Sequence, residues 1–171
     1  IGYRATGKSS VGKQLASELS FRFVDSDTMI CTAAGKSVKD IVAEEGWEGF
    51  RKRELNVLND LAGQSKIVIA TGGGAVLHPS VWPLLKKNSV VVWLTASEPL
   101  LVRRIQEDQD GSSGRPPLSI LELEAEIRGV LAKRLPLYKC YGDITIDTSG
   151  LEPQDVVRKI TGGLKQFGLL T

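Results

Sequence analysis

The stretch Gly2-Tyr3-Arg4-Ala5-Thr6-Gly7-Lys8-Ser9 decides the fold of this 171-residue chain. It matches the phosphate-loop pattern, in which a glycine and four further residues precede Gly-Lys-Ser. In such a loop, backbone N–H groups and the N-terminus of the next helix face phosphate oxygens, and the lysine reaches the β and γ phosphates. The alternative is a chance glycine-rich turn in front of a helix. The predicted nucleotide contacts are Gly2, Ala5, Thr6, Gly7, Lys8, Ser9 and Ser10.

The residues on either side of the loop support the phosphate-loop interpretation. Val11, Leu15 and Leu19 recur at four-residue spacing, which predicts an amphipathic helix directly after the loop. The motif also requires a strand in front of its first glycine. We therefore expect a strand that ends at Ile1 and begins upstream of it.

Downstream of the loop, strand-like and helix-like segments alternate. Short apolar runs predict strands at residues 21–24, 66–70, 90–94 and 144–146. The second and third runs contain continuous apolar stretches, as expected of parallel strands that are buried on both faces. Helical patterns occupy residues 38–62, 79–87, 99–107, 120–135 and 153–167. This order predicts an α/β three-layer sandwich in which helices flank a five-stranded parallel sheet, with the strand at Ile1 as the fifth.

Composition limits the remaining possibilities. Lys and Arg total 22 against 20 Asp and Glu, and the formal charge of +2 is too small for a nucleic-acid surface built on overall charge. No apolar run approaches the roughly 18 residues of a membrane span, and no signal segment opens the chain. Cys31 and Cys140 lie in no metal-ligand or redox spacing, which favours free thiols in a reducing cytoplasm. We expect one domain over residues 1–171, with no nucleic-acid or membrane partner.

Carboxylates and glycines follow two of the predicted strands. Val24-Asp25-Ser26-Asp27 ends the first, at the edge of the sheet where open α/β folds bind ligands. Alternate residues of an extended segment point apart, so one carboxylate can face a metal and phosphates while the other faces an acceptor hydroxyl. A helix cap is the alternative role. Gly72-Gly73-Gly74 ends the next strand, where backbone amides can approach a ligand closely, unless the triplet is a plain flexible loop.

These features, in this order, resemble the shikimate kinase family over nearly the whole chain. Trp47-Glu48-Gly49-Phe50-Arg51-Lys52-Arg53-Glu54 resembles the family's Phe-Arg-x-x-Glu helix. Arg134-Leu135-Pro136-Leu137-Tyr138 resembles its Arg-x-Pro-Leu-Tyr motif. Arg115-Pro116-Pro117-Leu118 resembles the Arg-Pro-x-Leu of a mobile lid, which falls here at about residues 106–120. Each arginine alone is more often a solvated surface cation, but three in the family's spacing favour a binding site.

The resemblance implies a monomeric, Mg²⁺-dependent enzyme that transfers the γ-phosphoryl group of ATP to the 3-hydroxyl of shikimate, a step of chorismate and aromatic amino acid biosynthesis. The catalytic residues that it implies are Lys8, Asp27 and Arg115. Mg²⁺ would be held by Ser9 and by Asp25, the latter through water. The implied acceptor residues are Asp27, Arg51, Gly72, Gly73, Gly74 and Arg134, and the acceptor region is helical at about residues 28–62. The additional nucleotide contacts are Arg104 and Arg115.

Two features depart from the family's pattern. Ala5 stands where many members have a second loop glycine, and the stretch 104–115 is a few residues longer than usual. Arg104 is the candidate for stacking on the adenine in this longer stretch. The segment Asp147-Thr148-Ser149-Gly150 is expected to flank the same base.

Two other functions remain open at this point. Another small P-loop kinase, such as a gluconate kinase or a nucleoside monophosphate kinase, would lack the combined carboxylate, glycine and arginine motifs. A non-catalytic nucleotide-binding or regulatory module would be marked by loss of Lys8, Asp27 or Arg115, all of which are present. Trp47 is the one tryptophan expected near the acceptor rather than in packing alone. The only histidine, His78, is assigned no catalytic role.

Overall fold

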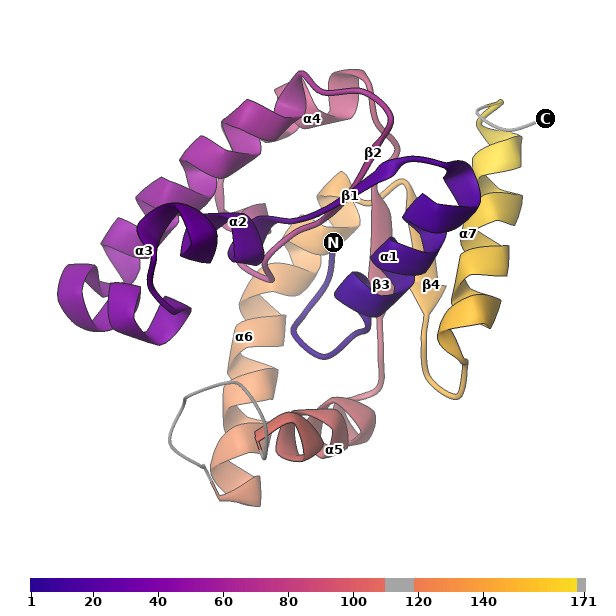
Figure 1. The fold of residues 1–171 in the computed structure, drawn as a ribbon. Coiled ribbons are helices and arrows are strands. Elements are labelled where there is room, and N and C mark those ends of the chain that lie inside the picture. Colours follow the sequence, from indigo (N-terminus) through magenta and orange to yellow (C-terminus); the bar gives the residue numbers. More distant parts are fainter. Residues whose placement is uncertain (110–118, 169–171) are drawn as a thin grey trace.

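The computed structural model describes residues 1–109 and 119–168 (Figure 1). Its elements follow in the order α1 (Lys8–Leu19), β1 (Arg22–Asp25), α2 (Ser26–Ala34), α3 (Val38–Ala62), β2 (Ile67–Ala70), the 3₁₀ turn η1 (Ala75–Leu77), α4 (Trp82–Lys87), β3 (Val92–Thr95), α5 (Glu98–Gln109), α6 (Ile120–Tyr141), β4 (Ile144–Asp147) and α7 (Pro153–Gln166). The predicted alternation of helices and strands is confirmed.

The strands are parallel and form two ladders. β1 pairs with β2 so that Arg22 lies opposite Ile67, and β3 pairs with β4 so that Val92 lies opposite Ile144. Ile1 lies along the other edge of β3, where its amino group donates to the Val92 carbonyl at 2.7 Å and its carbonyl accepts from Leu94 N–H at 2.9 Å. Among residues 1–109 and 119–168, the predicted five-stranded sheet is therefore two strand pairs with a single residue at the position of the fifth strand.

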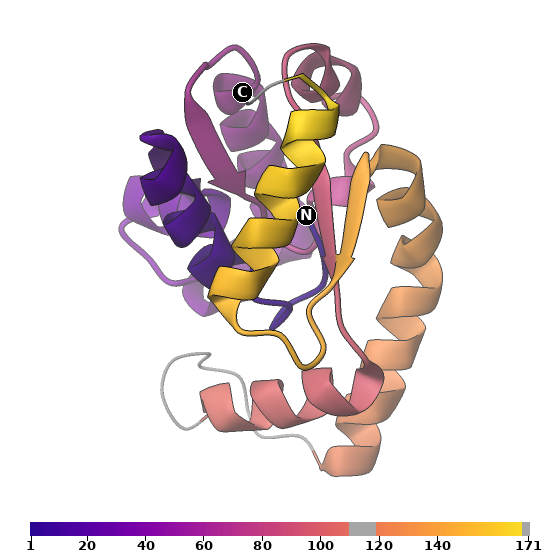
Figure 2. The same cartoon turned by 90° about the vertical axis from the view of Figure 1, so that its right-hand side faces the viewer.

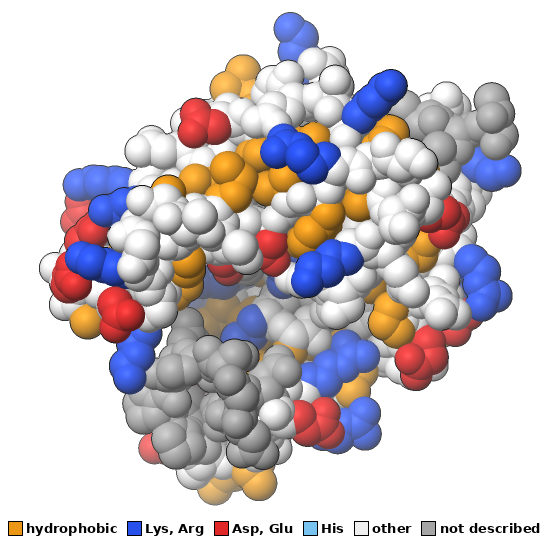
Figure 3. All heavy atoms as spheres, in the orientation of Figure 1, with side chains coloured by type: hydrophobic (Ala, Val, Ile, Leu, Met, Phe, Trp, Pro, Cys, Tyr) orange, Lys and Arg blue, Asp and Glu red, His pale blue; other side chains and the backbone are white. Residues whose placement is uncertain are grey.

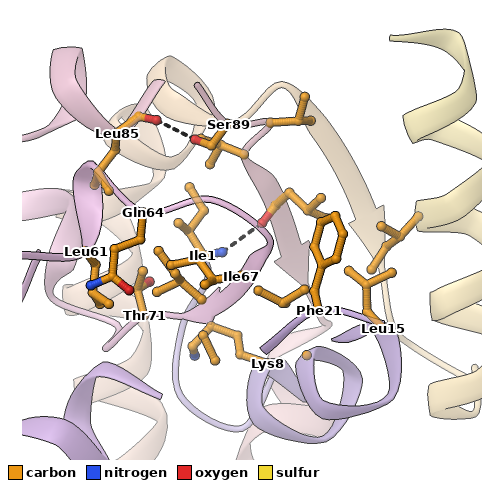
Figure 4. Close-up of a pocket in the computed structure, with 18 of the residues that line it drawn as sticks. Ile1, Lys8, Leu15, Phe21, Leu61, Gln64, Ile67, Thr71, Leu85 and Ser89 are labelled. Carbon is orange, nitrogen blue, oxygen red and sulfur yellow. Dashed lines mark hydrogen bonds between the residues drawn. The ribbon is translucent and has the colours of Figure 1, made fainter. Parts of the chain in front are cut away.

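An apolar cavity of about 350 Å³ lies between β2 and β3, where the two ladders fail to meet. Figure 4 shows Ile1 within this cavity, with Leu15 and Phe21 toward one end and Leu61 and Leu85 toward the other. The facing edges of β2 and β3 thus enclose a slot of the kind that a strand fills.

Helices cover both faces of the strands. On one face, α1 and α7 pack against β3 and β4 through a cluster of buried residues: Val11, Leu15, Leu94, Ile146, Val156, Val157, Ile160 and Leu164. On the other face, α3, α4 and α6 enclose a second cluster around β3: Leu58, Ala75, Val76, Val81, Trp82, Leu85, Val91, Trp93 and Tyr138. Figure 2 shows β3 and β4 between α7 on one side and α6 on the other. The three-layer arrangement agrees with the sequence-based expectation.

Two local predictions were wrong. Asp27 was expected on an extended segment, but the helix α2 begins at Ser26, because Asp25 Oδ1 caps it by accepting the N–H groups of Asp27 at 3.1 Å and Thr28 at 3.2 Å. The helix expected to end near residue 135 continues through Pro136 to Tyr141 as α6. Tyr138 is buried in the core, and this packing outweighs the helix-breaking tendency of the proline.

The surface and helices bear on the predicted partners. None of the described helices is long and apolar enough to cross a membrane. On the face drawn in Figure 3, lysine and arginine side chains are interspersed with carboxylates instead of forming one continuous basic field.

The predicted lid at residues 106–120 falls mostly on residues 110–118, so Arg115 lies outside the described residues.

Candidate active site

The phosphate loop joins Ile1 to α1, whose first residue is Lys8. Gly2 has a φ of 147°, and a Cβ there would overlap the Leu94 carbonyl, so only glycine fits. Ala5 has a φ of 61°, a left-handed conformation that disfavours alanine by about 1–2 kcal/mol relative to glycine. The loop therefore keeps the turn that a second glycine would give, at the expense of local strain.

Lys8 folds back over this loop. Its Nζ donates to the Tyr3 carbonyl at 2.7 Å, and Thr6 Oγ1 donates to the same oxygen at 2.8 Å. Burial lowers the pKa of Lys8 to about 8, although Asp27 and Asp25 partly oppose that shift. The buried ammonium is therefore short of negative charge, and a bound phosphate would supply it.

Ser9 and Asp25 meet beside the loop. Ser9 Oγ donates to Asp25 Oδ2 at 2.6 Å, while Asp25 Oδ1 caps α2 as described above. Asp25 thus caps the helix through one oxygen, while its other oxygen lies beside the serine with which it is predicted to hold Mg²⁺. A hydroxyl and a carboxylate are hard oxygen ligands, which suit Mg²⁺ together with water and phosphate oxygens. In the described ranges, no cluster of three or more His, Cys, Asp or Glu side chains could hold a metal by itself.

A second cavity, of about 420 Å³, opens next to the loop. The structure brings all six predicted acceptor residues into its lining: Asp27, Arg51, Gly72, Gly73, Gly74 and Arg134. They come from α2, α3, the loop after β2, and α6. In Figure 3 the surface is hollowed below α2 and α3, and acidic and basic side chains lie at the wall of this hollow.

Two arginines approach the glycine triplet from different helices. Arg134 Nη1, on α6, donates to the Gly73 carbonyl at 2.9 Å, and the Tyr138 hydroxyl donates to the same oxygen at 2.7 Å. Arg51, on α3, lies so close to Gly74 that a Cβ there would overlap its guanidinium. The triplet thus allows two cations to converge on one cavity.

Glu54 holds Arg51 in place. Its side chain is fully buried, and its Oε2 accepts hydrogen bonds from Arg51 Nη1 and from His78 Nε2, the latter at 2.8 Å. The Arg51 guanidinium also lies 5.4 Å from the ring centres of Trp47 and Phe50. Burial would raise the pKa of Glu54, but the His78 hydrogen bond and the Arg51 charge outweigh it and hold that pKa below its ordinary value. Glu54 therefore stays ionised at neutral pH.

Two buried carboxylate oxygens in the cavity have no hydrogen-bond partner among the described residues. They are Asp27 Oδ1 and Glu54 Oε1. A Cβ built on Gly72 would lie 2.5 Å from the first and 2.7 Å from the second, so both oxygens converge on the same point. Burial, followed by the charges of Glu54 and Asp25, raises the pKa of Asp27 to about 6. Both oxygens are thus available to a ligand that brings hydroxyl donors.

The predicted adenine residues also lie together. Arg104 Nη1, on α5, donates to the Ala5 carbonyl at 3.1 Å and to Thr148 Oγ1 at 3.5 Å. Thr148 belongs to the segment 147–150 after β4, and Ser149 Oγ in that segment accepts the N–H of Ser97 at 3.0 Å. Arg104 therefore bridges the phosphate loop and the segment expected to flank the base.

Three charged residues of the cavity lining were missed from the sequence. Glu54 stood in a recognised motif, and its i,i+3 spacing from Arg51 could have indicated the ion pair. Arg4 and Glu126 also line the cavity and pair at 3.3 Å across the loop and α6. No local pattern indicated that second pair, since 122 residues separate its members.

The site combines a phosphate-loop backbone and its lysine with a serine hydroxyl beside a carboxylate. These groups lie next to a cavity lined by arginines. This combination is typical of P-loop kinases that act on small anionic molecules. A family model described as shikimate kinase matches residues 4–165, and the chain belongs to that family.

Individual relatives agree with this assignment. A shikimate kinase of Syntrophus aciditrophicus is 43% identical over 168 residues, covering 94% of this chain and 86% of its own length. The solved shikimate kinase of Acinetobacter baumannii, in complex with shikimate, superposes with a TM-score of 0.88 at 34% identity and covers 98% of this chain and 92% of that one. A gluconokinase of Sinorhizobium meliloti has a TM-score of 0.53 at 16% identity over 98% of this chain and 90% of its own, and it shares the fold alone.

Proposed function

We propose that this chain transfers the γ-phosphoryl group of ATP to the 3-hydroxyl of shikimate, giving shikimate 3-phosphate and ADP. The observation that carries the proposal is the acceptor cavity. There Arg51 and Arg134 face the same space as two buried carboxylate oxygens that have no partner among the described residues. A ligand that satisfies both sets needs an anionic group and hydroxyl donors. Shikimate has a carboxylate and three hydroxyls, and a shikimate complex is known for a solved relative.

Arg51 and Arg134 would bind the acceptor carboxylate. A guanidinium presents paired N–H donors that match the two oxygens of a carboxylate. Both guanidinium groups already lie at the glycine triplet, and the ion pair with Glu54 keeps Arg51 from rotating freely. Backbone groups of Gly72, Gly73 and Gly74 complete this wall of the cavity.

Asp27 would orient the acceptor hydroxyl and accept its proton. Its Oδ1 is buried, lacks a partner among the described residues, and belongs to a group with a pKa of about 6. At neutral pH it is therefore ionised, yet closer to proton transfer than an ordinary aspartate. The charge of Lys8 acts on the pKa of Asp27, which supports an arrangement in which the acceptor hydroxyl would lie between this base and the phosphate.

The phosphate loop would neutralise the negative charge of the ATP phosphates. Lys8 and the N-terminus of α1 would hold the β and γ phosphates, while Ser9 and Asp25 would hold Mg²⁺, directly and through water respectively. When bound, the ion would offset the negative charge of the phosphate oxygens. Arg104 would contact the adenine, and Arg115, outside the described residues, is proposed to stabilise the transferring group.

We also propose the finer features of the fold. A strand ending at Ile1 would fill the slot between β2 and β3 and join the two ladders into a five-stranded sheet, in support of which the slot is apolar and bordered by two strand edges. One domain would span residues 1–171, with the acceptor region near 28–62 and a lid near 106–120. A monomer in the cytoplasm is proposed as well, supported by the free thiols of Cys31 and Cys140.

A coupled ADP-release assay tests the function. The enzyme is given ATP and Mg²⁺ with shikimate, gluconate or nucleoside monophosphates in parallel. The proposal predicts turnover with shikimate alone, and the product should carry phosphate on its 3-hydroxyl by ³¹P NMR. Faster turnover with gluconate or a nucleotide would refute it, and no turnover with any acceptor would favour a regulatory module.

A further inference from the structure

His78 lies outside the acceptor cavity and yet contacts one of its buried carboxylates. Its backbone is fixed between η1 and α4, where its N–H donates to the Ala75 carbonyl at 3.2 Å and its carbonyl accepts from Val81 N–H at 3.3 Å. Its side chain is only 10% exposed, and its Nε2 is 2.8 Å from Glu54 Oε2. The imidazole therefore links the loop after the glycine triplet to the middle of α3.

The chemistry of the contact fixes its direction. An ionised carboxylate has no hydrogen to donate, so His78 Nε2 carries the hydrogen and Glu54 Oε2 accepts it. The same Oε2 accepts from Arg51 Nη1, while Oε1 faces Gly72 without a partner among the described residues. His78 is thus the one donor to this carboxylate, in the part of the chain that the structure describes, that does not itself line the acceptor cavity.

We propose that His78 is a positioning residue for acceptor binding. By holding Glu54 from outside the cavity, it fixes the guanidinium of Arg51 against the acceptor carboxylate and keeps Oε1 directed at Gly72. This inference rests on the proposed acceptor site and adds to it a residue that contacts no substrate.

The reason is the burial of Glu54. A fully buried carboxylate such as Glu54 needs hydrogen-bond donors to stabilise its charge. Removal of one donor leaves the carboxylate with an unsatisfied oxygen or causes it to take up a proton. In either case the pairing with Arg51 weakens, and the arginine gains rotational freedom that acceptor binding must then remove. The expected effect falls on acceptor affinity and leaves nucleotide affinity unchanged, since Lys8 and Ser9 contact neither His78 nor Glu54 through any hydrogen bond described above.

Matched variants test the inference. His78→Leu removes the donor and keeps the bulk, while His78→Gln restores an amide donor near the position of Nε2. Lys86→Met is the control. Lys86 lies on the neighbouring α4, and the change breaks its 2.7 Å ion pair with Asp143, which precedes β4, without touching the cavity. The measurements are KM for shikimate and ATP, the Kd of shikimate by calorimetry, and Tm.

We expect His78→Leu to raise the shikimate KM and Kd by about 5- to 10-fold, with ATP KM within about twofold. This is less than the roughly 10- to 150-fold of a hydrogen bond lost directly to a charged group, because His78 acts on the acceptor only through Glu54. His78→Gln should recover most of the affinity. Lys86→Met should lower Tm and leave both affinities unchanged. If His78→Leu lowers Tm as Lys86→Met does but binds shikimate normally, the histidine is merely structural and the inference fails.

A second measurement does not depend on the acceptor. Arg51 lies 5.4 Å from the Trp47 ring, so displacement of the guanidinium should move the Trp47 indole N–H resonance in the ligand-free enzyme. His78→Leu should move it in the same direction as Arg51→Ala, and His78→Gln should not. An unmoved resonance in His78→Leu overturns the positioning role whatever the kinetics. If the resonance moves but the wild type does not phosphorylate shikimate, the proposed function is wrong while the positioning role stands.

Discussion

Gly74→Ala should weaken acceptor binding while the protein stays folded. The backbone at Gly74, with φ −91° and ψ −8°, is one that alanine adopts without strain. The added Cβ would overlap the guanidinium of Arg51, which is the far end of a flexible side chain and can swing away. The mutation should therefore leave the protein folded, with a change in unfolding free energy within about 1 kcal/mol, while it displaces one carboxylate-binding cation.

The magnitude follows from what Arg51 would contribute. A hydrogen-bonded contact between charged groups contributes roughly 1.5–3 kcal/mol, which corresponds to about 10- to 150-fold in affinity. Because Arg51 can retain its pairing with Glu54 after it moves, we expect the lower half of that range. The KM of shikimate should rise accordingly, with the KM of ATP unchanged.

Steady-state kinetics, calorimetry and thermal unfolding measure these quantities. Gly129→Ala is the matched control. Its added Cβ on α6 meets no atom within 4 Å among the described residues beyond its chain neighbours and the nearby backbone of its own helix, so it should leave both KM values unchanged. It should also stabilise the helix by roughly 0.5–1 kcal/mol. An unchanged shikimate KM in folded Gly74→Ala, or an equal rise in both KM values, would refute the placement of the acceptor carboxylate at Arg51.

Three further predictions concern individual side chains. The folded pKa of Asp27, about 6, lies above its ordinary 3.8, so this group's contribution to stability is lost as pH rises from about 4 through 6. Asp27→Asn should abolish turnover, because the base is lost, and should raise the unfolding free energy at pH 7.5 by at most about 3 kcal/mol. Wild-type kcat/KM for shikimate should fall as pH drops through about 6, because the carboxylate becomes protonated. Arg134→Ala should raise the shikimate KM about tenfold or more and the ATP KM less than about twofold, whereas Arg128→Ala, on the exposed side of the same helix, should change neither. Lys8→Met should lower kcat by about 10³-fold or more without loss of Tm, and wild-type kcat/KM for ATP should decline as pH rises through about 8, where the free ammonium loses its proton. Residual turnover near the wild-type rate in Lys8→Met, or a flat pH profile across either range, would contradict these assignments.

Local sequence was enough for much of the molecule. A phosphate loop needs particular residues at adjacent positions, and both its pattern and the helix after it were recognisable from residues 2–19. Continuous apolar runs predicted the parallel strands because burial on both faces leaves no room for alternation. The start of α2 at Ser26 was missed because its cap, Asp25, is equally compatible with a strand end followed by a loop.

The acceptor site contains contacts that sequence patterns do not predict. Arg51, Gly73 and Arg134 were predicted as members of one site through resemblance, and the structure places all three around one cavity. The contact between Glu54 and His78 could not be predicted, because a hydrogen bond between side chains 24 residues apart leaves no periodic signal.

The sequence by itself determined the nucleotide side of this protein, since a phosphate loop works through backbone geometry that a short run of residues specifies. Tertiary structure alone decided how the acceptor side is assembled. Helices α2, α3 and α6 and the glycine triplet must pack together before carboxylates and arginines from distant segments face one space. Burial in that space then sets the pKa of Asp27 and leaves Glu54 dependent on its partners, because the strength of an electrostatic interaction depends on the surroundings that only folding creates.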